Sequence, residues 1–85
     1  MPVTADQIRL KILAALPDAQ VTVEDMTGGG DHYEASVVAA EFRGKNPVEQ
    51  HRLIYAALGN WLQGPIHALA LHTRTPEEAA EKPAP

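Results

Sequence analysis

Residues 20–42 read QVTVEDMTGGGDHYEASVVAAEF. Residues 20–25 alternate polar and apolar side chains and are rich in β-branched residues, a pattern typical of a strand. Three consecutive glycines favour a loop over residues 27–31, because glycine is unfavourable inside helices and strands alike. A longer second strand is predicted over residues 33–42, centred on Val37 and Val38. Two strands joined by a short glycine-rich loop predict an antiparallel hairpin.

A helix is predicted on the amino-terminal side of this hairpin. Thr4 and Gln7 have the spacing of a capping box, in which each side chain bonds the backbone N–H of the other residue. Apolar residues follow at helical spacing, and Pro17 cannot continue a helix. The helix is therefore expected over residues 5–16.

A second helix is predicted on the carboxyl-terminal side of the hairpin. Asn46 and Glu49 form another capping box, and Pro47 stands at the first helical position, where its missing N–H is harmless. An apolar stripe follows, either as one helix or as two pieces broken near Gly59. Trp61 continues this stripe, so its side chain is expected to be at least partly buried.

The last strand is predicted over residues 66–73, directly after a Gly-Pro pair. Leu69 and Leu71 are expected on the face that meets the helices, and Ile66 on the opposite face. A helical crossover joins this strand to the preceding one, so the two should be parallel. The sequence therefore predicts an α+β sandwich of two layers, in the order αββα(α)β, with a small three-stranded mixed sheet.

The chain is long enough for one small domain. A single domain is predicted over residues 1–76, followed by a flexible, polar and Pro-rich tail over residues 77–85. Thr75 is expected to cap one helical turn at the point where the domain passes into the tail. With 85 residues, and 14 alanines among its apolar side chains, the chain can build only a thin core. A large buried substrate cavity is therefore not expected.

Composition excludes several classes of function. The chain has no cysteine, which removes disulfides, thiol nucleophiles and all-cysteine metal sites. Its net charge of −4 gives no general attraction to nucleic acid or anionic lipid. The sequence has no apolar run of ~18 residues and no signal-peptide pattern, so a cytoplasmic protein without membrane contact is expected.

Basic residues concentrate in the second half of the chain, where residues 42–75 carry a net charge of +3. Arg43, Lys45 and Arg52 are candidates for binding nucleic acid or another anion. Arg43 and Lys45 lie just before the second helix, whose free N–H groups and dipole favour negative charge. A plain capped helix with an ordinary solvated basic face is the alternative interpretation.

Three runs of the sequence resemble the BolA family: FRGK at residues 42–45, QHRLIYAAL at 50–58 and IHALALHTRTP at 66–76. The resemblance implies a fold similar to class II KH domains. It also implies a non-enzymatic partner of a monothiol glutaredoxin, sharing a bridged [2Fe–2S] cluster with that partner and glutathione in iron–sulfur trafficking or iron sensing. Some bacterial members of the family are DNA-binding transcriptional regulators, so DNA is the alternative partner.

The resemblance places cluster ligands at two histidines. The signature histidine of the family, at the start of the last strand, falls on His67, and a second ligand position, in the glycine-rich loop, falls on His32. Imidazole nitrogen is a suitable ligand for iron. From the residues alone, His67 could equally be a half-buried histidine bonded to a backbone carbonyl, and His32 a solvated loop residue beside Asp31.

No catalytic arrangement is found in the sequence. Ser36 is the one serine and has no nucleophile-elbow motif around it, and His51 and His72 belong to no close metal-ligand spacing. The chain is therefore not expected to be an enzyme or to have a small-molecule substrate. The G-x-x-G loop of a KH nucleic-acid site is also missing, which counts against sequence-specific RNA binding.

Overall fold

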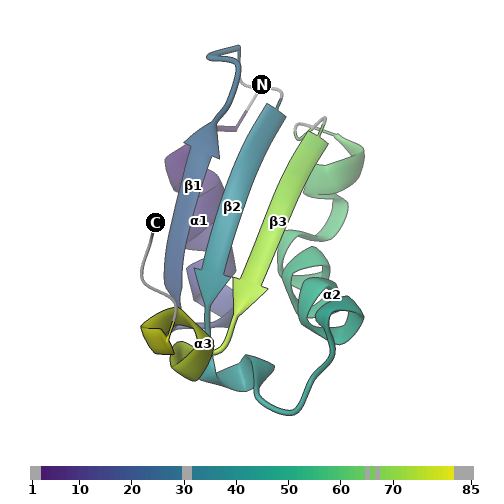
Figure 1. Cartoon of the computed structure of the whole chain (residues 1–85). Helices are drawn as coiled ribbons and strands as arrows, with labels where there is room; N and C mark the ends of the chain where they lie inside the picture. Colours follow the sequence, from purple (N-terminus) through teal and green to yellow (C-terminus); the bar gives the residue numbers. More distant parts are fainter. Residues whose placement is uncertain (1–2, 30–31, 65, 67, 82–85) are drawn as a thin grey trace.

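The structure is a computed structural model that describes residues 3–29, 32–64, 66 and 68–81. Its elements follow the order α1 (Ala5–Ala15), β1 (Gln20–Asp25), β2 (His32–Val38), the 3-10 helix η1 (Ala40–Phe42), α2 (Pro47–Leu58), the 3-10 helix η2 (Gly59–Gln63), β3 (Ala68–Arg74) and α3 (Pro76–Glu81). Figure 1 shows α1 and α2 on the same side of the sheet, which confirms the predicted α+β sandwich.

The three strands form one mixed sheet in the order β1-β2-β3. β1 and β2 are antiparallel, with Val23 opposite Ala35. β2 and β3 are parallel, with His32 opposite Ala68 at one end of the sheet and Val38 opposite Arg74 at the other. The predicted hairpin and the predicted parallel third strand are both confirmed.

The helix boundaries follow the caps that the sequence contains. Thr4 and Gln7 form the predicted capping box at the start of α1, and Asn46 and Glu49 form the second one at the start of α2. Of the two possibilities for the second helix, the broken form is the one observed, because α2 ends at Leu58 and η2 begins at Gly59, whose φ of +60° favours glycine.

The core forms where the two helices meet the sheet. Trp61 packs half-buried at its edge, as predicted, and its ring centroid lies 4.6 Å from Nζ of Lys11 on α1, a distance suited to a cation–π contact. Ten buried apolar side chains make up the core cluster: Ile8, Ile12, Leu16, Tyr33, Val37, Ala39, Phe42, Ile54, Leu58 and Ile66.

The predicted second strand was too long. β2 ends at Val38, and the chain then turns through η1. Buried residues alternate along β2 up to Ala39, so a continued strand would place Phe42 on the face of exposed Ser36. The 3-10 turn instead puts the Phe42 side chain in the core, where it is fully buried.

The predicted start of the last strand and the predicted orientation of Ile66 were wrong. β3 begins at Ala68, and Ile66 precedes it as a core residue that is 1% exposed. The Ile66 N–H donates to the carbonyl of Trp61 at 2.9 Å, so this residue closes the turn after η2 and does not extend the strand. Leu69 and Leu71 lie half-buried against the core, as expected.

The chain retains regular structure beyond the boundary predicted at residue 76. Thr75 caps α3 as expected: its Oγ1 accepts from the N–H of Glu78, and Glu78 Oε1 accepts from the Thr75 N–H. The helix α3 continues to Glu81. Within the described part of the chain, no helix is long and apolar enough to span a membrane.

One buried polar side chain ties the second helix to its surroundings. Gln50 is 7% exposed, and its Nε2 donates to the carbonyls of Phe42 and Lys45 at 3.2 and 2.9 Å. Its Oε1 accepts from the Thr73 hydroxyl at 2.7 Å. Gln50 therefore joins η1, the following loop and β3 around the first turns of α2.

We expect Gln50→Ala to lower the free energy of unfolding by about 2 kcal/mol, because it leaves buried carbonyls and a hydroxyl without their partner. Urea unfolding followed by far-UV circular dichroism measures this loss. Gln20→Ala is the matched control, since Gln20 lies exposed on β1. Equal stabilities of the two variants would contradict the role given to Gln50.

Candidate functional site

His32 is a strand residue in the structure, although the sequence placed it in the glycine-rich loop. It is the first residue of β2, and its carbonyl accepts from the N–H of Met26 at 2.8 Å, which closes the hairpin. The side chain is half-buried, and its Nδ1 is buried from solvent. The sheet therefore holds the His32 backbone in place at the end where β2 and β3 begin.

His67 and Asp31 lie outside the described residues, so the predicted role of His67 stays a prediction. The sequence neighbours of His67 are described: Ile66 is buried in the core, and Ala68 is the first residue of β3. Ala68 is the partner of His32 in the parallel register. The first residue of β3, which directly follows position 67, is therefore the partner of His32, the other candidate ligand.

The remaining two histidines have other surroundings. His72 lies exposed on β3, with its Nε2 3.1 Å from Oε2 of Glu34. The His51 ring on α2 meets the Tyr55 ring edge-on, with 6.2 Å between the centroids. In the described part of the chain, no group of three or more His, Asp or Glu side chains is placed to hold a metal ion.

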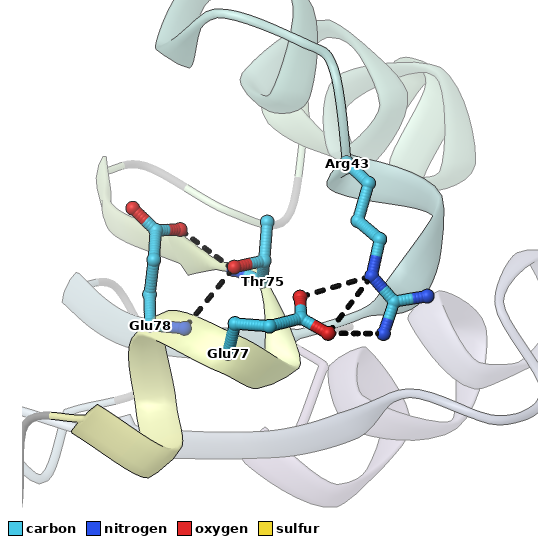
Figure 2. A network of polar contacts seen from close by, with 4 residues as sticks. All are labelled: Arg43, Thr75, Glu77 and Glu78. Atoms are coloured by element: carbon cyan, nitrogen blue, oxygen red, sulfur yellow. Dashed lines mark hydrogen bonds and ion pairs between the residues drawn. The ribbon is translucent and has the colours of Figure 1, made fainter.

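The three basic candidates do not form one cluster. Arg43 binds Glu77 of α3, with Nη2–Oε2 and Nε–Oε1 distances of 2.6 and 2.9 Å (Figure 2). Lys45 lines a groove between α2 and β3, whereas Arg52 lies exposed on α2 outside the described lining of that groove. Arg43 is also outside the described lining of the groove, so the three residues have three different surroundings.

The groove is open, has a volume of about 370 Å³ and carries more basic than acidic side chains. Arg74 contributes the second cation of the groove besides Lys45. It belongs to the basic segment of residues 42–75 but was not among the predicted site residues. The described lining of the groove consists of Lys45, Pro47, Gln50, His51, Leu71, His72, Thr73, Arg74 and Glu78.

The groove and His32 lie at opposite ends of the third strand. His32 pairs with Ala68, the first residue of β3, whereas the groove is lined by residues 71–74 in the second half of this strand. The six residue steps from Ala68 to Arg74 span about 20 Å at the rise of a β-strand. The two candidate sites can therefore be altered separately.

The contact between Arg43 and Glu77 shifts the pKa of both groups. The hydrogen bond from the guanidinium lowers the pKa of the Glu77 carboxyl, and the same hydrogen bond raises the pKa of Arg43. Because the carboxylate is the form that accepts these hydrogen bonds, the contact is complete at neutral pH. It is lost as the pH falls through the lowered pKa of Glu77, while Arg43 stays protonated.

We expect Arg43→Gln to raise the pKa of the Glu77 carboxyl towards the ordinary value of a glutamate, because the variant removes the charged donor. An NMR titration of the Glu77 carboxyl carbon in the two proteins measures the difference. Both side chains are exposed, so the unfolding midpoint should change little. Coincident titration curves would contradict the pairing.

The structure is therefore a small α+β domain with two candidate binding features. These are a histidine at the start of β2, suited to binding a metal, and a basic groove, suited to binding an anion. The chain belongs to the BolA-like protein family, whose model matches residues 8–78. It is 38% identical over 83 residues to BolA-like protein 1 of Bos taurus, covering 89% of this chain but only 62% of that protein.

Two further proteins of the same family are similar to this chain. The structure of a BolA protein homologue from Coxiella burnetii superimposes with a TM-score of 0.79 and 40% identity, covering 94% of this chain and 99% of that chain. The DNA-binding transcriptional regulator BolA of Vibrio cholerae is 43% identical over 51 residues, covering 60% of this chain and 48% of that protein. The match to the Coxiella burnetii structure confirms the predicted α+β fold with its small three-stranded mixed sheet.

Proposed function

We propose that this chain is a non-enzymatic partner of a monothiol glutaredoxin, with which it shares a bridged [2Fe–2S] cluster in iron–sulfur trafficking or iron sensing. His67 and His32 are the proposed ligands from this chain, and the glutaredoxin and glutathione supply the thiolates. The observation that carries the proposal is the pairing of His32 with Ala68, the covalent neighbour of His67.

The donor set of the chain fits a shared cluster. The sequence has no cysteine, so imidazole nitrogen is the borderline-soft donor that it offers to iron. A [2Fe–2S] cluster takes four protein ligands, so two histidines from this chain leave the remaining positions to the glutaredoxin and glutathione in this proposal. Replacing a thiolate by imidazole on one iron raises the reduction potential of such a cluster, as in Rieske centres.

His32 suits this role in its geometry. A ligand on a strand keeps its orientation when a partner docks, which lowers the entropy lost on binding. The half-buried position of the ring restricts its rotamers. The part of this chain in binding is therefore to present imidazole from a fixed backbone.

Co-expression with a monothiol glutaredoxin tests the proposal. A one-to-one complex is expected to co-purify and to show a visible absorption and circular dichroism spectrum that differs from that of the glutaredoxin homodimer. A glutaredoxin that keeps its own cluster spectrum, with no complex on size-exclusion chromatography, would contradict the proposal.

A second candidate function is DNA binding through the basic groove. Lys45 and Arg74 in the groove support it, as does the name of the Vibrio cholerae relative. The net charge of −4 predicts weak binding that falls steeply with salt. A titration with a DNA duplex at two salt concentrations separates the functions, because tight, sequence-selective and salt-resistant binding would favour the regulator.

A further inference from the structure

We propose that α3 is an acidic cover, built into the chain, that competes with external phosphate groups for the basic residues beside α2. The cover consists of Glu77 and Glu78, and the basic residues are Arg43, Lys45 and Arg74. This inference rests on the second candidate function, because it concerns how anion binding is controlled at the groove, which Lys45 and Arg74 line, and at Arg43, two residues before Lys45.

The first carboxylate of the cover occupies the guanidinium of Arg43. Glu77 accepts from Nε and Nη2 of Arg43 with both of its oxygens, at distances of 2.6 to 3.1 Å (Figure 2). Arginine presents a planar fork of donors that fits a carboxylate and a phosphate in the same way. Glu77 therefore occupies the donor edge of Arg43 formed by Nε and Nη2, and a phosphate group that binds this edge has to displace it.

The second carboxylate of the cover lies in the groove itself. Glu78 lines the groove together with Lys45 and Arg74. Its capping contact with Thr75 holds the Glu78 side chain at the start of α3. The three basic residues and the two carboxylates together carry a net charge of only +1, so α3 removes most of the attraction that the basic residues have for an anion.

The cover is weak enough to be displaced. α3 has six residues, fewer than an isolated helix needs to be stable in water, so it depends on its cap and on its contacts with β3 and Arg43. The side chains of Arg43 and Glu77 are 55% and 59% exposed, and exposed ion pairs contribute little to stability and are screened by salt. A ligand with several phosphates can therefore compete with Glu77.

The test is a titration of the full chain with inorganic tripolyphosphate, read from the Arg43 Nε–Hε signal in ¹⁵N-labelled protein. We expect Glu77→Gln to bind tripolyphosphate about two- to fivefold more tightly than the wild type, the range that an exposed ion pair provides. Glu24→Gln is the matched control, since it makes the same change in charge on β1, at the opposite edge of the sheet from β3.

A double variant separates the cover from a general effect of charge. In the Arg43→Gln background, where binding is read from the backbone amide signals of Lys45 and Arg74, Glu77→Gln should give no more gain than Glu24→Gln, because the cation that Glu77 occupies is gone. Two results would overturn the proposal: equal gains for Glu77→Gln and Glu24→Gln in the Arg43 protein, or no response of the Arg43 signal to tripolyphosphate in any variant.

A DNA duplex in place of tripolyphosphate distinguishes the cover from the candidate function on which it rests. If Glu77→Gln strengthens tripolyphosphate binding but no variant binds the duplex, the cover is supported and the DNA-binding function is contradicted. If the duplex binds as well, the Glu77→Gln protein should show a salt slope steeper by about one, because one more cation contacts a phosphate.

Discussion

Replacing His67 by alanine is expected to abolish the cluster spectrum of the complex with a monothiol glutaredoxin. His67 is a proposed ligand of the cluster, and alanine removes its nitrogen donor without a substitute. Loss of one ligand from a shared cluster returns the cluster to the glutaredoxin or releases it. Visible circular dichroism of the variant mixed with cluster-loaded glutaredoxin measures the loss, and far-UV circular dichroism checks the fold.

His32→Ala and His72→Ala are the comparisons for this result. His32→Ala should weaken the cluster signal less severely, because a neighbouring oxygen donor such as Asp31 or water can take its place. His72→Ala should leave the signal unchanged, since that side chain contacts Glu34 on the exposed surface of the sheet. A folded His67→Ala protein with the wild-type cluster spectrum would contradict the ligand assignment.

Phe42→Ala is expected to have the largest effect on stability, about 3–5 kcal/mol of the free energy of unfolding. Phe42 is fully buried, and it is the residue that the turn after β2 carries into the core. The ring belongs to the core cluster formed by side chains of the sheet and of both helices, so its loss leaves a cavity in that cluster. Because small domains have about 5–15 kcal/mol in total, the variant should be close to unfolding at 37 °C.

Urea unfolding of Phe42→Ala and Phe42→Leu measures this effect. The leucine variant keeps much of the buried volume, so it should lose less than half as much stability as the alanine variant. Exposed Leu10 on α1 provides the surface control, and Leu10→Ala should change stability by less than about 0.5 kcal/mol. A Phe42→Ala protein as stable as Leu10→Ala would contradict the position given to the ring.

The parts of the fold that were predicted correctly depend on local signals. Both capping boxes form at the predicted residues, because the two partners in each box are three positions apart in the sequence. The strand pattern of β1 predicted its limits, since side chains alternate faces along a strand. The parallel third strand followed from connectivity rules.

The wrong predictions depend on contacts between distant parts of the chain. The second strand was predicted to continue through residues 39–42, but the core accepts the Phe42 side chain only if the chain turns there. The strand pattern also included Ile66, which instead packs in the core after η2. Neither packing interaction leaves a sign in the local sequence pattern.

In the candidate site too, features set by local sequence were predicted, and features set by contacts between distant residues were not. The sequence identified His32, but its place as the first strand residue depends on pairing with Ala68, far along the chain. The Arg43–Glu77 contact joins residues 34 positions apart. The distribution of charge along the sequence therefore indicated Arg43 as a candidate but not Glu77 as its partner. Gln50 could have been found, because it stands four residues before Ile54 and eight before Leu58 on the buried face of α2.

Pulsed electron paramagnetic resonance of the reduced complex tests the central claim most directly. The chain is labelled with ¹⁵N-histidine, combined with an unlabelled glutaredoxin and the cluster, and reduced by one electron. The account predicts a strong ¹⁵N coupling to the cluster from this chain, which disappears in His67→Ala and persists in His72→Ala. A complex whose cluster shows no ¹⁵N coupling would contradict the claim that this chain supplies a histidine ligand.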